Sequence, residues 1–409
     1  MERYFVHKEA VLDKDKSLVG YELFFRKASS THLNLRWPLT TVDAEVIEAV
    51  SEAGGFERLI GNRQAFVSIN PELLEAGEID SLPKGTVLQI SEKDGLDKDV
   101  YINSALLKKR SYSISIEHTS SGPGFMPFHQ IADFVRTDAL SFHNDQIAST
   151  VSLFKKLPLK LMVANVNDKQ TFVYYKALGF DVFEGAFFTQ PVRNASESIS
   201  SSQTLLIQLS NDLRANKELS LIEKTFRNSP KLTYGLLKLI NSAFFGVSQK
   251  ISSIRHAIAL LGYENLQKWV SLLLFTIDMR DGQSNPLIEK AVVRARVMEL
   301  LAKRIGDKSF SDTAFITGMF SFVSVLFNVG SNEVTEKLNL APEIQDALVN
   351  REGPLGILLN LAEKMDRQDY EAMDKELEDL KLVIQDVLSA ETGAVLECQT
   401  VLAGGGSAG

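Results

Sequence analysis

Apolar residues in the first half of the chain gather in short runs rich in β-branched and aromatic side chains, a pattern typical of buried strands. Eight such runs cover residues 5–12, 18–25, 65–69, 86–90, 112–116, 133–137, 159–164 and 182–188. Apolar residues at helical spacing separate most of them, in stretches 41–53, 98–109, 145–156 and 168–178. This alternation predicts a compact (β/α)8 barrel, a TIM-like α/β fold. A doubly wound open sheet is the alternative, but its glycine-rich phosphate loop is absent after the first run.

The strand pattern disappears in the second half of the chain. From residue 204 onward, leucine and isoleucine recur at helical spacing, which predicts an all-helical domain over residues 204–398. The small, Ser-rich stretch 194–203 predicts a linker to the barrel domain, which spans 1–193. The glycine-rich end, residues 399–409, predicts a disordered tail.

The composition narrows the classes of partner. The formal net charge of −8 argues against nucleic acid and anionic membranes as partners. The longest apolar segment, residues 315–329, is shorter than the roughly 20 residues that cross a bilayer, and the N-terminus lacks a signal-peptide pattern. Cys398 is the only cysteine, so an internal disulfide is impossible. We expect a cytoplasmic protein that does not bind a membrane.

Polar residues at the predicted strand ends suggest a site. Glu22 lies within an apolar strand that ends on Arg26, and a buried carboxylate is costly unless it has a partner, such as Arg26 itself. Because the carboxyl ends of barrel strands meet on one face, we expect the strand-end residues to lie together there. They are Glu22, Asn70, Gln89, Glu117, His118, Arg136, Asn165 and Asp168.

In this order the strand ends resemble the EAL family, bacterial phosphodiesterases of cyclic di-GMP. The stretch from Gly20 to Arg26 is similar to the family's Gly-x-Glu-Ala-Leu-x-Arg motif, and Asn70 to an Asn that follows a strand. The stretch from Glu184 to Pro191 is similar to the closing Gln-Gly-Tyr-x-Phe-x-x-Pro motif. The resemblance covers the whole first domain and implies an EAL-type barrel.

The departures from the family concern its metal ligands. EAL enzymes hold two divalent cations with several carboxylates and one Asn, and a metal pair needs concentrated negative charge. Glu22 and Asn70 match ligands, but Gln89 stands in place of a carboxylate. The family's Asp-Asp pair falls on Glu117 and His118, of which only Glu117 keeps a charge.

The remaining matched positions depart further. Arg136 replaces the Lys near the attacking water, and a guanidinium is a poor substitute for a compact ammonium. Asn165 and Asp168 match a Glu-x-x-Glu pattern, so its first carboxylate is absent. We therefore expect no catalytic residues and no cofactor. We expect Mg²⁺ or Mn²⁺ to bind only if residual phosphodiesterase activity exists. Its candidate ligands are then Glu22, Asn70 and Glu117. A single transition metal on Glu22, Glu117 and His118 is a further alternative.

Nucleotide binding without hydrolysis is a separate hypothesis. Arg26 matches a residue that contacts a phosphate in the family, and a guanidinium is well shaped for that contact. Arg136 supplies a second positive charge. The alternative for Arg26 is a salt bridge to a neighbouring carboxylate.

The helical half resembles the HDOD family, a helical output domain related to HD phosphohydrolases. The similarity rests on residues 236–246 (LLKLINSAFFG) and 251–262 (ISSIRHAIALLG), and further on residues 294–296 and 314–321. HD hydrolases need several His ligands and a His-Asp pair. Only one His, His256, follows residue 200, and no His-Asp dipeptide exists, so we expect no metal chemistry here. We interpret His256 as a helix or core residue.

Together these observations predict a non-catalytic signal-transduction protein of the cyclic di-GMP network. We expect it to bind an unidentified signalling protein, with the HDOD domain as the contact, and the EAL resemblance adds a homodimer through the barrel. A cyclic di-GMP sensor without hydrolysis and a weak cyclic di-GMP phosphodiesterase are the alternatives.

Overall fold

A computed structural model of the chain divides into two compact units, Met1–Gln190 and Pro191–Gly409. The structure describes residues 4–27, 42–74, 77–91, 93–94, 97–118, 128, 130–140, 147, 151–189, 201–229, 232, 253–276, 286–327 and 340–406. Of the predicted linker 194–203, residues 194–200 lie outside this set.

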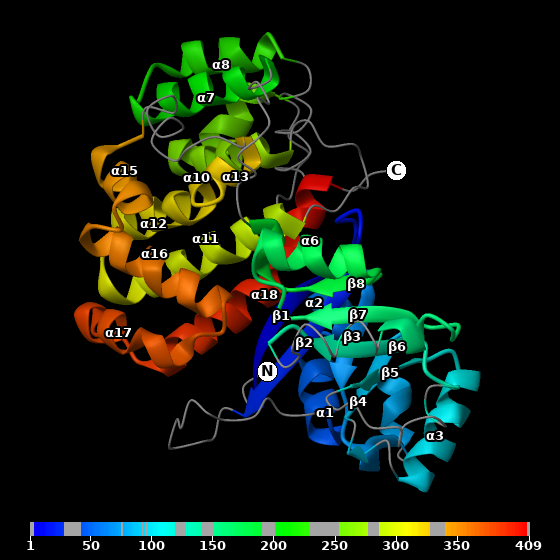
Figure 1. Cartoon of the computed structure of the whole chain (residues 1–409). Helices are drawn as coiled ribbons and strands as arrows, with labels where there is room; N and C mark the ends of the chain where they lie inside the picture. Colours follow the sequence, from blue (N-terminus) through cyan, green and yellow to red (C-terminus); the bar gives the residue numbers. More distant parts are fainter. Residues whose placement is uncertain are drawn as a thin grey trace. The chain divides into compact units, whose positions relative to one another are not determined.

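The first unit is a closed barrel of eight strands in sequence order (Figure 1). Its strands are β1 (Tyr4–Asp13), β2 (Leu18–Lys27), β3 (Gln64–Ser68), β4 (Val87–Ile90), β5 (Ser113–Glu117), β6 (Phe134–Asp138), β7 (Lys160–Ala164) and β8 (Val182–Glu184). The predicted TIM-like barrel is confirmed. The parallel arrangement is wrong for β1, which runs antiparallel to both β2 and β8.

The short turn between β1 and β2 explains this reversal. A parallel crossover needs a dozen or more residues, whereas an antiparallel pair needs only a tight turn. The carboxylate of Asp13 accepts hydrogen bonds from the backbone N–H groups of Asp15 and Ser17, at 2.8 and 2.9 Å. Lys16 adopts a left-handed conformation with φ 63° in the same turn. The chain therefore folds straight back on itself.

Helices and 3-10 turns connect the parallel strands. They are α1 (Ala44–Glu52), α2 (Phe56–Ile60), η1 (Pro71–Leu74), η2 (Gly77–Ser81), α3 (Lys98–Lys109), α6 (Lys169–Leu178) and η5 (Ala186–Thr189). Side chains of Asp43, Asp97 and Asp168 cap α1, α3 and α6 by accepting backbone hydrogen bonds in the first turn. The predicted strand 182–188 ends early, at Glu184. Gly185 has φ 132°, and a side chain on it would collide with the backbone of Val166.

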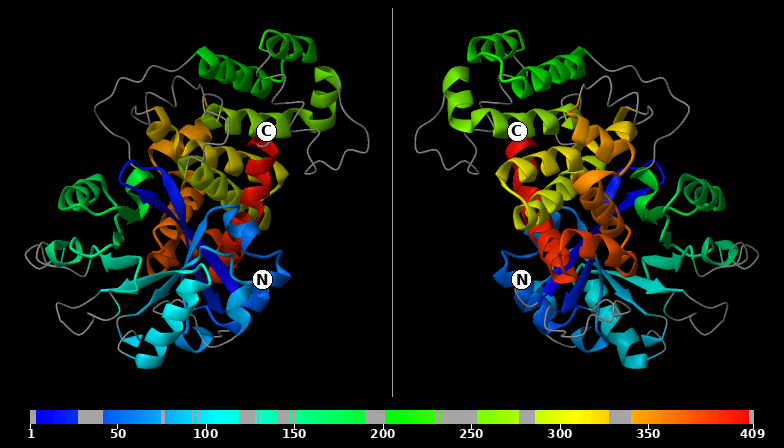
Figure 2. Two further views of the ribbon diagram at one scale, coloured as in Figure 1. Left: turned by 90° about the vertical axis from the view of Figure 1, so that its right-hand side faces the viewer. Right: turned by 90° about the vertical axis from the view of Figure 1, so that its left-hand side faces the viewer.

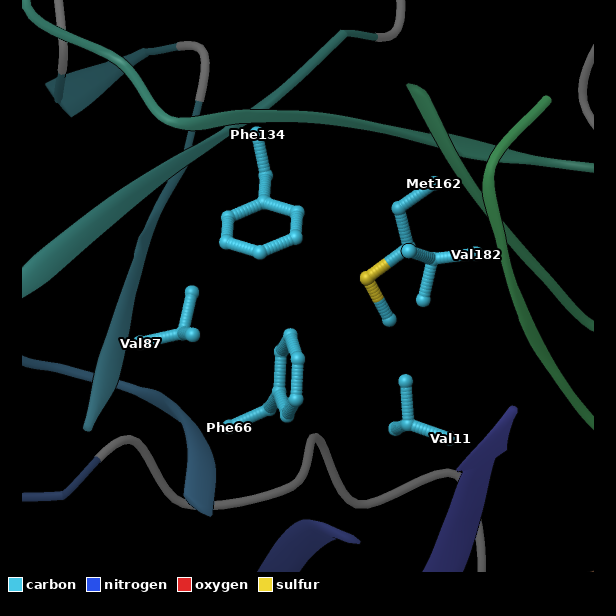
Figure 3. Close-up of a cluster of buried hydrophobic side chains, with 6 residues drawn as sticks. All are labelled: Val11, Phe66, Val87, Phe134, Met162 and Val182. Carbon is cyan, nitrogen blue, oxygen red and sulfur yellow. The ribbon is translucent and has the colours of Figure 1, made fainter. Parts of the chain in front are cut away.

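The lower part of the barrel interior is an apolar plug. Val11, Phe66, Val87, Phe134, Met162 and Val182 form a buried cluster, drawn in Figure 3. Alternation along a strand places every second residue on the same face. Gln89, Arg136 and Glu184 each lie two residues after a member of this cluster, on β4, β6 and β8. Their side chains therefore share the inner face of the barrel with it. A polar layer thus lies above an apolar floor.

The second unit contains helices and no strand among its described residues (Figure 2), so the predicted helical domain is confirmed. Its elements are α7 (Ser201–Arg214), α8 (Leu219–Arg227), α10 (Ile254–Thr276), α11 (Pro286–Ile305), α12 (Lys308–Phe320), α13 (Val323–Phe327), α15 (Pro342–Val349), α16 (Gly353–Asp366), η7 (Tyr370–Met373), α17 (Asp374–Leu380) and α18 (Ile384–Gly406).

Two predicted boundaries of this unit need correction. Helix α7 begins at Ser201, inside the stretch predicted as a linker, because a helix can extend its first turn through polar residues ahead of the buried Leu206. Helix α18 continues to Gly406, so the predicted disordered tail is wrong up to that residue. Backbone hydrogen bonds propagate beyond the buried turn at Cys398 despite the unfavourable glycines. Residues 407–409 lie outside the described set.

A close helix crossing organises the centre of the second unit. A Cβ placed on Gly318 of α12 would lie 2.6 Å from the Cα of Ala295 on α11. No real Cβ tolerates that distance, so glycine lets the two backbones approach. Residues 294–296 and 314–321, which carry part of the HDOD similarity, therefore pack against each other.

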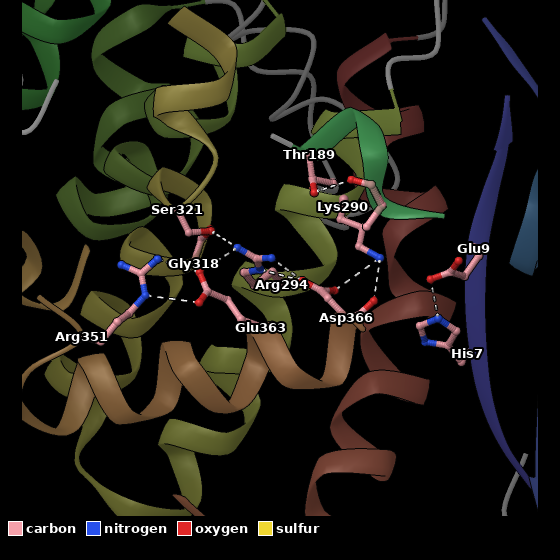
Figure 4. A network of polar contacts seen from close by, with 11 residues as sticks. His7, Glu9, Thr189, Lys290, Arg294, Gly318, Ser321, Arg351, Glu363 and Asp366 are labelled. Atoms are coloured by element: carbon pink, nitrogen blue, oxygen red, sulfur yellow. Dashed lines mark hydrogen bonds and ion pairs between the residues drawn. The ribbon is translucent and has the colours of Figure 1, made fainter. Parts of the chain in front are cut away.

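A buried arginine joins α11 to α16. The Nε–H of Arg294 donates to the carboxylate of Asp366 at 2.8 Å, and its Nη1 donates to the hydroxyl of Ser321 at 2.8 Å (Figure 4). The guanidinium lies 3.9 Å from the ring centroid of Phe322. A buried charge needs such partners, so this network is part of the core.

In the described part of the chain, no helix has the length and apolar character needed to cross a bilayer. The apolar segment 315–329 does not form one helix. It contributes to α12 and α13, which are separate, and its last two residues lie outside the described set.

Candidate functional site at the barrel mouth

Glu22 lies deep in the barrel, on β2. Its register partner on β3 is Phe66 of the apolar plug, and the residue is only 1% exposed. Gly20, two residues earlier, faces the same way, and a side chain there would collide with the backbone of Gln64. The Gly-x-Glu pattern thus combines a close strand approach with an inward carboxylate.

Arg136 on β6 contacts three carboxylates at once. Its Nη2 lies 3.2 Å from an oxygen of Glu22 and 3.0 Å from an oxygen of Glu184. Its Nη1 donates to Glu117 at 3.2 Å. The side chains of Glu22 and Glu184 are almost fully buried, whereas that of Glu117 is 32% exposed. We call these four residues the Arg136 cluster.

Burial and like charges change the acidity of this cluster. Burial, followed by the neighbouring carboxylate of Glu22, raises the pKa of Glu184 well above its ordinary value. Burial likewise raises the pKa of Glu117. Burial alone would lower the pKa of Arg136. The three carboxylates together have the larger effect and raise that pKa above its ordinary value. Glu184 therefore holds a proton to a higher pH than an exposed glutamate does.

Gln89 lies on β4 in a neutral part of the same inner layer. Its side-chain carbonyl accepts a hydrogen bond from the hydroxyl of Ser68 at 3.2 Å. Register pairs it with Ser115 on β5. Among the described residues, the Nε2 of Gln89 and the Oγ of Ser115 are buried without a hydrogen-bond partner. A neutral amide thus stands where the resemblance places a carboxylate ligand.

Three other predicted positions serve the loops that hold them. The side-chain oxygen of Asn70 accepts from the backbone N–H of Glu72 at 3.0 Å and caps η1. The two oxygens of Asp168 accept from the N–H and hydroxyl of Thr171, at 2.8 and 2.7 Å, and cap α6. Asn165 has φ 60°, a left-handed conformation that Asn tolerates after β7. The contacts of Asn70 and Asp168 are therefore local rather than shared with the Arg136 cluster.

His118 and Arg26 lie at other places on the barrel. The backbone N–H of His118 donates to the carbonyl of Arg136 at 2.8 Å, and its ring packs edge-on against Phe154 at 5.1 Å. Arg26 lies four residues beyond Glu22 on β2 and is half-buried. Phosphate contacts for Arg26 and Arg136 stay predictions, although the terminal nitrogens of Arg136 already contact carboxylates.

The residues do not fit a pair of divalent cations. Among the described residues, no group of three or more His, Cys, Asp or Glu side chains is arranged to hold a metal ion. Gln89 and His118 bring no negative charge, and Glu22, Glu117 and Glu184 already contact the guanidinium of Arg136. Glu22, Glu117 and His118, the alternative ligands of one metal ion, do not form such a group either.

Glu184 is the one member of the cluster that was not among the predicted site residues, although it lies at the end of a predicted strand. It opens the stretch similar to the family's closing motif, where the family has a neutral Gln. An acidic residue at the end of a buried strand was the available signal. Only the fold shows that Glu184 pairs with Arg136 on β6.

The helical unit gives no second site among its described residues. The similarity segment 236–246 lies outside them. His256 is on helix α10 as expected, but it is exposed near the first turn and not in the core, because the inner face of that turn belongs to Ala257 and Ile258.

Comparison with known proteins places these features in context. The family model described as HDOD domain matches residues 200–345. The chain is 24% identical over 387 residues to cyclic di-GMP phosphodiesterase CdgJ of Vibrio cholerae, covering 94% of this chain and 89% of that protein. It is 23% identical over 378 residues to the uncharacterized protein YuxH of Bacillus subtilis, covering 90% and 92%.

Among solved structures, an EAL domain protein of Listeria monocytogenes has 18% sequence identity, covers 47% of this chain and 89% of that chain, and has a TM-score of 0.37. The family model matches part of the helical half of the chain, and the two relatives cover most of its length. The chain therefore combines a TIM-like barrel, whose strand ends resemble the EAL family, with a helical domain that the HDOD model matches.

Proposed function

We propose that the protein is a non-catalytic signal-transduction protein of the cyclic di-GMP network and acts by binding another protein. Support for the network comes from CdgJ, a relative over most of both chains whose name is that of a cyclic di-GMP phosphodiesterase. Support for a contact role comes from the HDOD match over residues 200–345. We also propose a cytoplasmic location, because of the composition, and a homodimer that forms through the barrel.

The Arg136 cluster is the observation that carries the non-catalytic part. Two-metal hydrolysis of a phosphodiester requires cations to generate the nucleophile and to neutralise the leaving oxygen. Here one guanidinium contacts Glu22, Glu117 and Glu184, so the three side chains already share a cation that belongs to the chain.

A weak cyclic di-GMP phosphodiesterase is the second candidate, favoured by the name of CdgJ. It would require divalent cations to displace Arg136 from the buried carboxylates. A cyclic di-GMP sensor is the third, and it depends on Arg26, whose position on β2 beyond Glu22 matches the family's phosphate contact.

Calorimetric titration of cyclic di-GMP into the full chain, with and without Mg²⁺ or Mn²⁺, separates the three candidates when the products are then analysed by chromatography. The proposal expects no product under any condition. Heat without product, lost in R26A, identifies a sensor. Product that depends on the added metal establishes a phosphodiesterase and overturns the proposal.

A further inference from the structure

We infer that the guanidinium of Arg136 is the resident cation of the barrel mouth and that the cavity it fills is shaped for an organic cation rather than for a divalent metal ion. This inference deepens the proposed function and rests on it, because both concern the same cluster. It assigns Arg136 a positioning role, holding three carboxylates that would otherwise repel one another.

The contact pattern supports a guanidinium-shaped site. The two terminal nitrogens of Arg136 divide the carboxylates between them, Nη2 contacting Glu22 and Glu184 while Nη1 contacts Glu117. A planar fork with separated donors matches carboxylates on different strands.

The distances lead to the same conclusion. The three nitrogen–oxygen distances are 3.0 to 3.2 Å. Oxygen ligands lie at about 2.0–2.6 Å from Mg²⁺ or Ca²⁺. The contacts therefore have the length of hydrogen bonds to a guanidinium and not of metal–oxygen bonds, and the carboxylates come from β2, β5 and β8.

The surroundings contain a second sign that the layer is built for polar recognition. Gln89 is 2% exposed, and its Nε2 has no hydrogen-bond partner among the described residues. The same holds for the Nε of Arg136 itself. Among the described residues, the inner layer therefore holds buried polar atoms of both kinds without partners, including the Oε2 of Glu22, and β4 contributes no carboxylate.

Chemical rescue tests the inference. In the full chain, R136A removes the guanidinium and leaves its cavity, and methylguanidinium is then added at millimolar concentration. We expect R136A to unfold at a lower temperature than the natural chain and methylguanidinium to raise its Tm by roughly 2–4 °C. The matched control is R110A, which removes an exposed arginine paired with Asp80 and should show no such gain.

Several outcomes would overturn the inference. One is equal response of R136A and R110A to methylguanidinium, and another is rescue of R136A by Mn²⁺ but not by methylguanidinium. If R136A does not fold with either addition, R136K decides, since it keeps the charge but loses the fork. R136K as stable as the natural chain contradicts the inference, and a clear loss of stability supports it.

The rescue experiment and the hydrolysis test have separate readouts, so their failures can be told apart. Hydrolysis by the natural chain would overturn the proposed function while rescue of R136A by methylguanidinium still stood. Failed rescue, with no hydrolysis, would overturn only the inference about the resident cation.

Discussion

The carboxylate of Asp168 uses both of its oxygens on Thr171 at the first turn of α6. These hydrogen bonds lower its pKa below the ordinary value. Side-chain caps of this kind satisfy backbone N–H groups that have no partner within the helix. A residue matched to a metal-binding motif thus has a complete structural role without a metal.

We expect D168A to lower the free energy of unfolding by about 0.5–2 kcal/mol, the usual effect of losing an N-cap. Urea denaturation of the full chain measures this change. In the control D15A, which removes a carboxylate that is 70% exposed, the change should stay within about 0.5 kcal/mol. Equal losses in the two variants would contradict the capping role.

Glu184 makes stability depend on pH. Because its pKa is raised in the folded chain, its contribution is fully present below the unfolded pKa of about 4.3 and is lost as the pH rises through the folded value. Glutamine has nearly the same shape but never ionises. We therefore expect E184Q to gain thermal stability relative to the natural chain as the pH rises from about 5 to 8.

The control for E184Q is E57Q, which changes an exposed glutamate on α2. Its difference in Tm from the natural chain should vary little over the same pH range. A difference for E184Q that is flat, or that falls with rising pH, would show that Glu184 does not hold its proton more tightly in the folded chain.

At the scale of elements, the crossing of α11 and α12 depends on one glycine. A Cβ on Gly318 would meet the backbone of Ala295 at 2.6 Å, and backbone cannot move aside as a flexible side chain can. The neighbouring Arg294 joins α11 to α16 through Asp366, so displacement at the crossing also disturbs a buried charge pair.

We expect G318A to lower the free energy of unfolding by about 1–3 kcal/mol through overpacking. G393A is the matched control, because Gly393 lies within helix α18 and its added Cβ would make an ordinary 3.5 Å contact with Leu300. Alanine there should stabilise by about 0.5–1 kcal/mol. Denaturation curves that move in the same direction for both variants would contradict the close crossing.

At the scale of the whole molecule, we expect internal charge pairing to make the fold independent of added metal. EDTA should leave the Tm of the natural chain unchanged, since the carboxylates of the barrel mouth already pair with Arg136. Calorimetry before and after chelation measures this. A fall of several degrees, reversed by Mn²⁺, would show a bound metal that stabilises the fold.

Local patterns in the sequence determined most of the secondary structure. The stretch 98–109 is a helix with the predicted bounds, and the strand around Glu22 extends only two residues beyond its predicted end. Apolar periodicity predicts such elements because burial of one face stabilises each of them. The same patterns separated a barrel from a helical domain. The short turn before Leu18 is also a sequence signal for an antiparallel β1, because a parallel crossover needs a dozen or more residues.

Only the tertiary structure decided which polar residues meet. Glu22, Glu117, Arg136 and Glu184 come from four strands, and their contacts depend on register and barrel closure. Asn70 and Asp168, equally acceptable as ligands by residue type, instead cap their own loops. Sequence spacing sets which face of a strand a side chain occupies. Which distant charge it meets is decided by the closed barrel, because buried charges must find partners in three dimensions.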